Sequence, residues 1–148
     1  MIDPAKSMDE NIIRLFFQKD GYLYDETRNL LTQEFADVSF VNNIVEQIAS
    51  GGNTLNTIAG KIGEKEQTVL YSLDKLISVG LIEKKKCITD EKNKKKTQYV
   101  LKDYMFKFWY EFIPKATSVI EMGQGEIYYQ DTQSGLKHYQ KRMYCCLH

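Results

Sequence analysis

Apolar residues recur at helical spacing in three consecutive segments near the middle of the chain. In the first segment, residues 39–50, the apolar positions fall on one helical face: Phe40, Val41, Ile44, Val45, Ile48 and Ala49. Asp37 or Ser39 is the expected N-cap, and the Gly51-Gly52 pair is the expected stop. The pattern therefore predicts one helix with one buried face.

Two further helical segments follow directly. Thr54 is the expected N-cap of a helix that ends at Ile62, and Gly63 supplies the tight turn that a helix pair needs there. A third helix is predicted over 66–79, and Gly80 ends it. Its apolar stripe consists of Val69, Leu70, Leu73, Leu76 and Ile77.

A short hairpin is predicted after the third helix, over 81–101. Its second strand covers 97–101, and the polar loop 89–96 has no apolar residue to bury. Helix, turn, helix and hairpin follow one another as in a winged helix-turn-helix, so we predict one over 37–102, with the loop as its wing. The predicted fold class is mainly α with a small β-hairpin, in which the winged helix is flanked by N-terminal and C-terminal helices.

The residues before this region, 1–36, predict two short helices. A capping box of Ser7 and Glu10 precedes an apolar stripe of Ile12, Ile13, Phe16 and Phe17. A second helix is expected over 25–35. Two helices are too few to bury both apolar faces alone, so we expect them to pack on the winged helix, on a partner chain or on further protein.

Residues 103–129 form a segment that is dense in aromatic side chains, with Asp103 as its expected cap. Its core stripe is predicted to be Met105, Phe108, Trp109 and Phe112. Pro114 is expected to end or kink this helix, which restarts over 115–122. The tail, 130–148, has no clear periodicity, so we expect it to be weakly ordered, with a short helix near 136–143.

Charge changes this picture only locally. The chain has 20 basic and 20 acidic residues, so any affinity for nucleic acid must come from clustering. Seven lysines against three acids give residues 83–96 a local charge of +4: Lys84, Lys85, Lys86, Lys92, Lys94, Lys95 and Lys96. Such a loop can rest on phosphates, which adds salt-sensitive affinity; the alternative is a solvated hairpin that serves solubility.

The third helix indicates nucleic-acid binding less clearly. Gln67 can pair with adenine and Tyr71 with a phosphate, but acids outnumber bases by one over 64–75, so the helix is also compatible with binding protein. With the wing included, the candidate DNA-binding residues are Gln67, Thr68, Tyr71, Lys75, Lys84, Lys86, Lys92, Lys94, Lys95 and Lys96.

No catalytic or metal-binding cluster is recognisable. His138 and His148 lie in the tail without a carboxylate or thiol partner, and the cysteines lack the spacing of metal ligands: Cys87, Cys145 and Cys146. We therefore expect a non-enzymatic chain without a metal. No apolar run approaches membrane-spanning length and no signal pattern occurs, so we expect a cytoplasmic protein with no membrane contact.

Three stretches carry a resemblance to a known family: YDETRNLLTQEF (24–35), TLNTIAGKIGEKEQTVLYSLDKLISVGLIEKK (54–85) and YVLKDYMFKFWYEFI (99–113). They resemble the part that follows the nucleotide-binding domain in archaeal and bacterial P-loop ATPases of the STAND-like branch of the AAA superfamily. The last stretch is the most specific, because an aspartate and a dense Phe-Trp-Tyr helix directly after a wing are unusual outside that family. The resemblance covers about 7–129.

The resemblance implies a helical lid over 1–36, then the winged helix, within a protein that uses ATP and Mg. This chain has no Gly-rich loop that ends in Lys-Ser or Lys-Thr, so ATP and Mg belong to the missing domain and no cofactor is expected here. The tail after Tyr129 departs from the family pattern and is too short for a nuclease-like domain. We therefore expect a fragment that is truncated at both ends.

The expected function is that of a non-catalytic winged-helix module that binds double-stranded DNA. The alternative is a regulatory module that binds its own ATPase domain or a partner protein and gates nucleotide state. We also expect a homodimer, because the neighbours that would cover four aromatic rings are missing: Phe16, Phe17, Phe106 and Tyr110. Burying such rings at ~1.5 to 3 kcal/mol each outweighs the low end of association costs.

Overall fold

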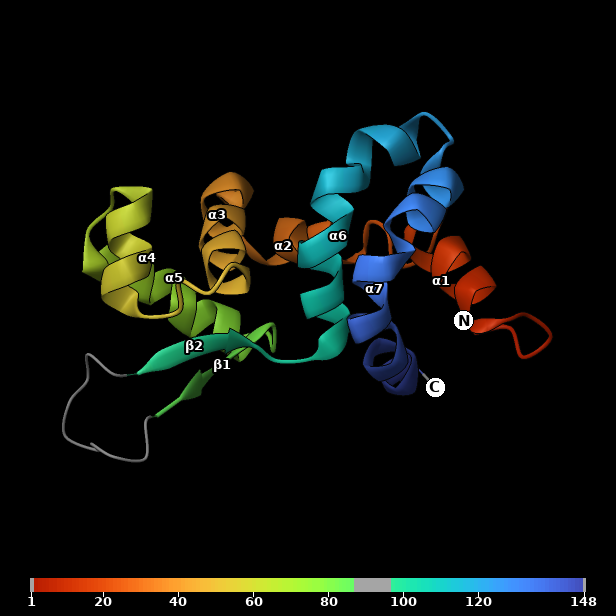
Figure 1. Cartoon of the computed structure of the whole chain (residues 1–148). Helices are drawn as coiled ribbons and strands as arrows, with labels where there is room; N and C mark the ends of the chain where they lie inside the picture. Colours follow the sequence, from red (N-terminus) through yellow and green to blue (C-terminus); the bar gives the residue numbers. More distant parts are fainter. Residues whose placement is uncertain (1, 87–96, 148) are drawn as a thin grey trace. The chain divides into compact units, whose positions relative to one another are not determined.

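The computed structural model describes residues 2–86 and 97–147, which are mainly helical and contain a two-stranded antiparallel sheet (Figure 1). The elements, in chain order, are α1 (Met8–Phe16), α2 (Glu26–Glu34), α3 (Val38–Ala49), α4 (Leu55–Ile62), α5 (Glu66–Ser78), β1 (Ile82–Lys85), β2 (Gln98–Leu101), α6 (Tyr104–Glu121) and α7 (Gly125–Leu147). The predicted fold class, mainly α with a small β-hairpin, is confirmed.

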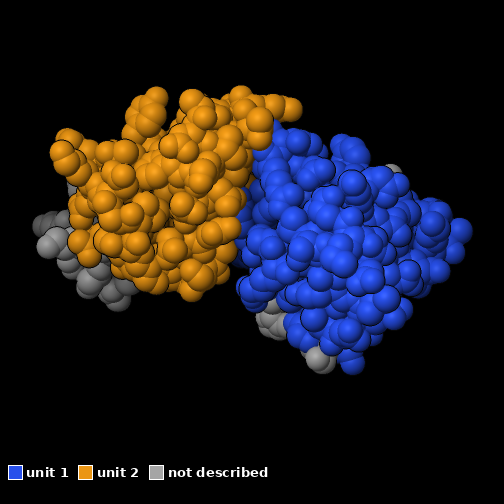
Figure 2. All heavy atoms as spheres, turned by 90° about the horizontal axis from the view of Figure 1, so that it is seen from above, with its two compact units in different colours: residues 1–30, 104–148 blue, residues 31–103 orange. Residues whose placement is uncertain are grey.

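The chain forms two compact units (Figure 2). Unit 1 combines residues 1–30 with 104–148, and unit 2 consists of residues 31–103. The region predicted to be a winged helix, 37–102, lies entirely in unit 2. The N-terminal helix, the aromatic segment and the tail, which the sequence pattern divided into separate segments, belong together in unit 1.

Local signals determine the helices of unit 2. Asp37, rather than Ser39, caps α3, because its Oδ1 accepts the backbone N–H of Phe40 at 3.0 Å. Thr54 caps α4 as predicted, with its Oγ1 accepting from the N–H of Thr57 at 3.3 Å. Gly63 has a φ of 78°, the left-handed conformation that ends α4 and lets α5 start at Glu66.

The core of unit 2 takes apolar residues from the end of α2 and from every later element of the unit. Its buried apolar members are Leu31, Phe35, Val41, Ile44, Val45, Ile48, Ile58, Ala59, Val69, Leu73, Leu76, Leu81, Ile82, Tyr99 and Leu101. The centres of the predicted apolar faces of α3, α4 and α5 are therefore turned inward. Residues at their margins are only half-buried: Phe40, Ala49, Leu55, Ile62, Leu70 and Ile77.

The hairpin has the register Ile82↔Leu101 to Lys85↔Gln98. It is also joined to the connection between α3 and α4, where Thr54 forms a β-bridge with Gln98 and the N–H of Tyr99 donates to the carbonyl of Asn53 at 2.7 Å. This bridge, which the sequence pattern did not predict, fixes the hairpin to the start of α4. The predicted wing loop, residues 89–96, lies outside the described residues.

Unit 1 is built around aromatic rings from three helices. Phe16 of α1 contacts Phe108 of α6, with ring centroids 4.9 Å apart. Phe17, directly after α1, packs against Tyr129 of α7 at 5.2 Å and Tyr128 at 6.3 Å. The capping box of α1 is formed as predicted, with Ser7 Oγ accepting from the N–H of Glu10 and the Glu10 carboxylate accepting from the N–H of Ser7.

Three expectations for unit 1 are corrected, wholly or in part, and the first concerns the tail. Helix α7 is continuous over Gly125–Leu147, where the sequence predicted weak order. Among its described side chains, the buried hydrophobic ones are Tyr129 and Leu136, which are two turns apart and too sparse to form a recognisable stripe. Packing against α1 and α6 supplies the stabilisation that the local pattern does not indicate.

The second correction concerns Pro114, which was predicted to end or kink the aromatic helix and does not end it. Helix α6 continues through it to Glu121. Proline removes one backbone hydrogen bond, but the buried face continues beyond it with Ala116 and Ile120. Burial on both sides of Pro114 therefore offsets the missing hydrogen bond and holds one uninterrupted helix.

The third correction concerns the aromatic rings that were expected to be exposed. Phe16, Phe17 and Tyr110 are buried, and Phe106 is half-buried. The predicted stripe of α6 is also rotated, because Met105 and Phe112 are only half-buried. The cover comes from within the chain, since α7 packs on the end of α1. Exposed rings therefore no longer support a homodimer, which stays a prediction.

Candidate nucleic-acid interface

Helix α5 presents a polar row on the side opposite its buried face. Gln67, Thr68 and Tyr71 are all exposed, and Tyr71 is 76% exposed. Val69, Leu73 and Leu76 are buried on the other side, so the amphipathic pattern of α5 orients this row outward. At the start of α5, the Glu66 carboxylate accepts a hydrogen bond from Asn56 Nδ2 of α4 at 3.2 Å. The polar row is thus carried by a helix that is fixed in the helix pair.

An ion pair joins α5 to the base of the hairpin. Lys84 Nζ on β1 lies 3.7 Å from Asp74 Oδ1 on α5, and it also lies 6.0 Å from the centre of the Tyr99 ring. Lys86, which follows β1, is exposed. The polar row of α5 and the first lysines of the hairpin therefore belong to one connected surface of unit 2.

Tyr99 lies beneath this connection and is almost fully buried. Burial raises the pKa of its hydroxyl above the usual value of 10, and the negative charge of Asp74 raises it further. Tyr99 is therefore neutral at physiological pH. Its ring supports Lys84 and is not available as a charged or nucleophilic group.

Lys75, another predicted DNA contact, has a structural partner. Its Nζ donates a hydrogen bond to the carbonyl oxygen of Glu34, at the end of α2, and lies 4.8 Å from the centre of the Phe35 ring. The side chain is half-buried. Lys75 lies one helical turn after Tyr71, but its ammonium group bonds the end of α2 and so holds α2 against α5. The remaining predicted contacts lie outside the described residues: Lys92, Lys94, Lys95 and Lys96.

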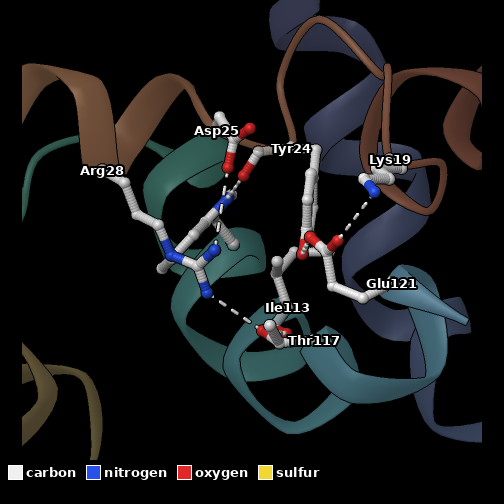
Figure 3. Close-up of polar contacts among 8 residues, drawn as sticks. Lys19, Tyr24, Asp25, Arg28, Ile113, Thr117 and Glu121 are labelled. Carbon is white, nitrogen blue, oxygen red and sulfur yellow. Dashed lines mark hydrogen bonds and ion pairs between the residues drawn. The ribbon is translucent and has the colours of Figure 1, made fainter.

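Sequence reasoning missed a polar network in unit 1 (Figure 3). The hydroxyl of Tyr24 donates to Glu121 Oε1 at 2.8 Å, and Trp109 Nε1 donates to the carbonyl of Tyr24 at 2.8 Å. Arg28 Nη2 donates to Thr117 Oγ1 at 3.0 Å. The spacing of Tyr24 and Arg28, one helical turn apart within the conspicuous YDETR run, is the signal that could have suggested a shared partner.

This network binds the segment before α2 and the first turn of α2 to α6. The guanidinium of Arg28 lies 5.6 Å from both the Tyr24 and Trp109 ring centres, so both rings attract its positive charge. Burial raises the pKa of Tyr24, and the hydrogen bond to Glu121 raises it further. With Tyr24 neutral and its hydroxyl engaged, the arrangement stabilises unit 1 and contains no activated nucleophile.

In the part of the chain that the structure describes, no group of three or more His, Cys, Asp or Glu residues is placed to hold a metal ion. The side chains of His138, Cys145 and Cys146, together with residues Cys87 and His148, lie outside that part. Among the same described residues, no helix is both long enough and apolar enough to cross a membrane.

Comparison with known proteins gives one informative similarity. The chain is 33% identical over 116 residues to the uncharacterized protein MJECL04 of Methanocaldococcus jannaschii. The match covers 78% of this chain but 26% of that protein, so the chain spans about a quarter of the length of this relative. No protein-family profile matches the chain. No solved structure matches it either.

Proposed function

We propose that residues 37–102 form a winged helix-turn-helix that binds double-stranded DNA, as a non-catalytic module of a larger cytoplasmic ATPase of the STAND-like type. Helix α5 lies towards the major groove, and the lysines of the hairpin rest on the phosphate backbone. The observation that carries this proposal is the exposed row of Gln67, Thr68 and Tyr71 beside the lysine-bearing hairpin, joined by the pair of Lys84 and Asp74.

The residue types on this surface match the chemistry of DNA. The Gln67 amide can donate to and accept from adenine in the major groove, and the Thr68 and Tyr71 hydroxyls are suited to phosphate oxygens. Hairpin lysines would release counterions from the backbone. Because the chain has no net charge overall, the affinity must come from these clustered lysines, and their phosphate contacts make binding salt-dependent without adding sequence preference.

The experiment is a titration of the full chain with a random-sequence duplex at two salt concentrations. The test variant replaces Lys92, Lys94, Lys95 and Lys96 by Ala. Its control carries the same charge change on exposed lysines of unit 1: Lys6, Lys19, Lys115 and Lys137. We expect the test variant to lower affinity about tenfold or more and to reduce the salt slope by about 0.9 for each phosphate that it no longer neutralises. Equal affinity and slope in both variants would refute the role of the wing.

A second function, protein recognition, is favoured by one specific observation. Tyr71 exposes 76% of its surface, while Lys84, the nearest hairpin lysine with a described partner, is already paired with Asp74. Tyrosine is enriched among the residues that contribute most to protein–protein binding, so an exposed tyrosine next to a lysine that already has a partner favours a protein ligand. In this alternative the module binds the ATPase domain of its own protein, or a partner, and gates nucleotide state; the much greater length of the relative leaves room for such a domain.

The two functions are separated by one pair of measurements. In the second function, the separately expressed nucleotide-binding domain would be captured by this chain, capture would be abolished by Tyr71→Ala, and duplex binding would be absent at low salt. Tyr22→Ala is the matched control, because Tyr22 is an exposed tyrosine of unit 1. Duplex binding without capture of the domain would reject the second function.

A further inference from the structure

Unit 1 contains a cavity of about 380 Å³ where three helix ends meet. Its lining comes from residues 17–20 after α1, from the end of α6 and from the start of α7. Its apolar lining residues, Phe17 and Ile120, are both buried. The cavity is large enough to hold an extended side chain, and such a side chain can enter it from solvent.

The charges around this cavity favour a cation. Its ionisable residues are Lys19, Asp20, Glu121 and Glu126, so three carboxylates and one ammonium leave a charge of −2. Lys19 Nζ already lies 3.6 Å from Glu121 Oε2. Within the described residues, Asp20 and Glu126 form no ion pair. They are both exposed, so a ligand can reach them.

The backbone adds to the negative electrostatic potential of the cavity. Helices α1 and α6 end at the cavity, and a helix C-terminus carries a partial negative charge of about half a unit. Only α7 begins there, with the opposite sign. The two negative ends outweigh the positive one, and Glu126 in the first turn of α7 offsets that positive end further.

The rim favours an organic cation over a metal ion. The described residues contain no cluster of three ligands that converge on one point, here or elsewhere. Instead, two large apolar side chains stand beside lining residues in the sequence: Met122, which is 71% exposed, and Ile127, which is 57% exposed. Exposed apolar side chains that adjoin a cavity are typical of a surface that contacts another polypeptide.

We propose that this cavity accepts a lysine or arginine side chain from a segment of a partner polypeptide, with apolar neighbours of that side chain resting on Met122 and Ile127. The aliphatic stem of such a side chain covers apolar surface while its charged end reaches Asp20 and Glu126. This site is independent of the proposed DNA interface, because all of its residues belong to unit 1 and those of the DNA interface belong to unit 2.

The test is an NMR titration of the full, isotope-labelled chain with two capped tripeptides, Leu-Arg-Leu and Leu-citrulline-Leu. Citrulline keeps the shape of arginine and removes its charge. We expect the arginine peptide to shift the backbone signals of Gly123 and Gly125, and to bind about tenfold more tightly than the citrulline peptide, as expected for partly exposed pairs with two carboxylates. Equal binding of both peptides, or no shift at these glycines, would overturn the proposal.

A variant of the chain then tests the carboxylates themselves. Asp20→Asn with Glu126→Gln should abolish the advantage of the arginine peptide, whereas the control, Glu26→Gln with Asp131→Asn, removes the same charge from exposed positions of unit 1 and should retain it. Equal loss in both variants would show a general charge effect and refute the site. Agmatine binding as tightly as the peptide would also refute it, because the site would then recognise a small amine.

Discussion

The backbone of Gly125 lies directly against the carbonyl oxygen of Phe17, so closely that a Cβ atom on Gly125 would be 1.8 Å from that oxygen. The start of α7 thereby meets the end of α1, and only a residue without a side chain permits this approach. The contact places α7 where Tyr128 and Tyr129 cover the ring of Phe17.

Replacing Gly125 by Ala should therefore destabilise the chain, by at least about 2 kcal/mol, because backbone must move to relieve the overlap. Gly135, on the same helix, is exposed and has no atom within 4 Å of its added Cβ. Gly135→Ala should instead stabilise by about 0.5 to 1 kcal/mol through its higher helix propensity. Urea unfolding of both variants measures the difference, and similar changes in the two would show that the contact is not tight.

Tyr24 predicts a loss of stability at high pH. The pKa of its hydroxyl is raised in the folded state, so folding favours the neutral form. The contribution of Tyr24 to the free energy of unfolding is therefore complete below the unfolded pKa of about 10. It is lost as pH rises through the folded pKa. Tyr24→Phe should lower the free energy of unfolding by about 1 kcal/mol at pH 7, because the hydrogen bond to Glu121 is removed. Between neutral and high pH, this variant should lose less stability than the wild type.

Lysines that titrate in the same range affect both proteins, so the difference between the two urea-unfolding curves isolates Tyr24. Tyr22→Phe, at an exposed position, is the control and should follow the wild type at every pH. If Tyr24→Phe and the wild type lose stability equally above pH 9, burial of the Tyr24 hydroxyl does not control this dependence.

Removing the charge of Asp74 should raise duplex affinity, whereas removing the hairpin lysines should lower it. The Asp74 carboxylate is paired with Lys84 and stands on the helix proposed to face DNA. Asp74→Asn should release Lys84 for a phosphate and remove repulsion, which raises duplex affinity about threefold and steepens the salt dependence. The control, Asp131→Asn, makes the same charge change in unit 1. Unchanged affinity in Asp74→Asn would argue that α5 does not approach DNA.

Lys75 should affect stability rather than DNA binding. Its ammonium group bonds the Glu34 carbonyl and lies over the Phe35 ring, so Lys75→Met, which retains most of the stem, should cost about 1 kcal/mol in urea unfolding. Duplex affinity at low salt should change less than in Lys86→Met, where the side chain is exposed. A larger loss of affinity for Lys75→Met would place Lys75 in the DNA interface after all.

The sequence by itself determined the features that depend on neighbouring residues. The capping residues Ser7 and Thr54, the turn at Gly63 and the end of α5 near Gly80 are local signals, because each satisfies backbone groups or backbone angles within a few residues. The same holds for the amphipathic pattern of α3 to α5 and for the hairpin. That pattern was sufficient to predict which side of α5 carries Gln67 and Tyr71.

Only the tertiary structure decided the features that join distant residues. The cover over Phe17, the continuation of α6 through Pro114, the anchor of Lys75 on Glu34 and the cavity of unit 1 all depend on which segments pack together. Their free energy comes from burial and hydrogen bonds between positions up to about a hundred residues apart, and periodicity and caps report only the local part of that balance.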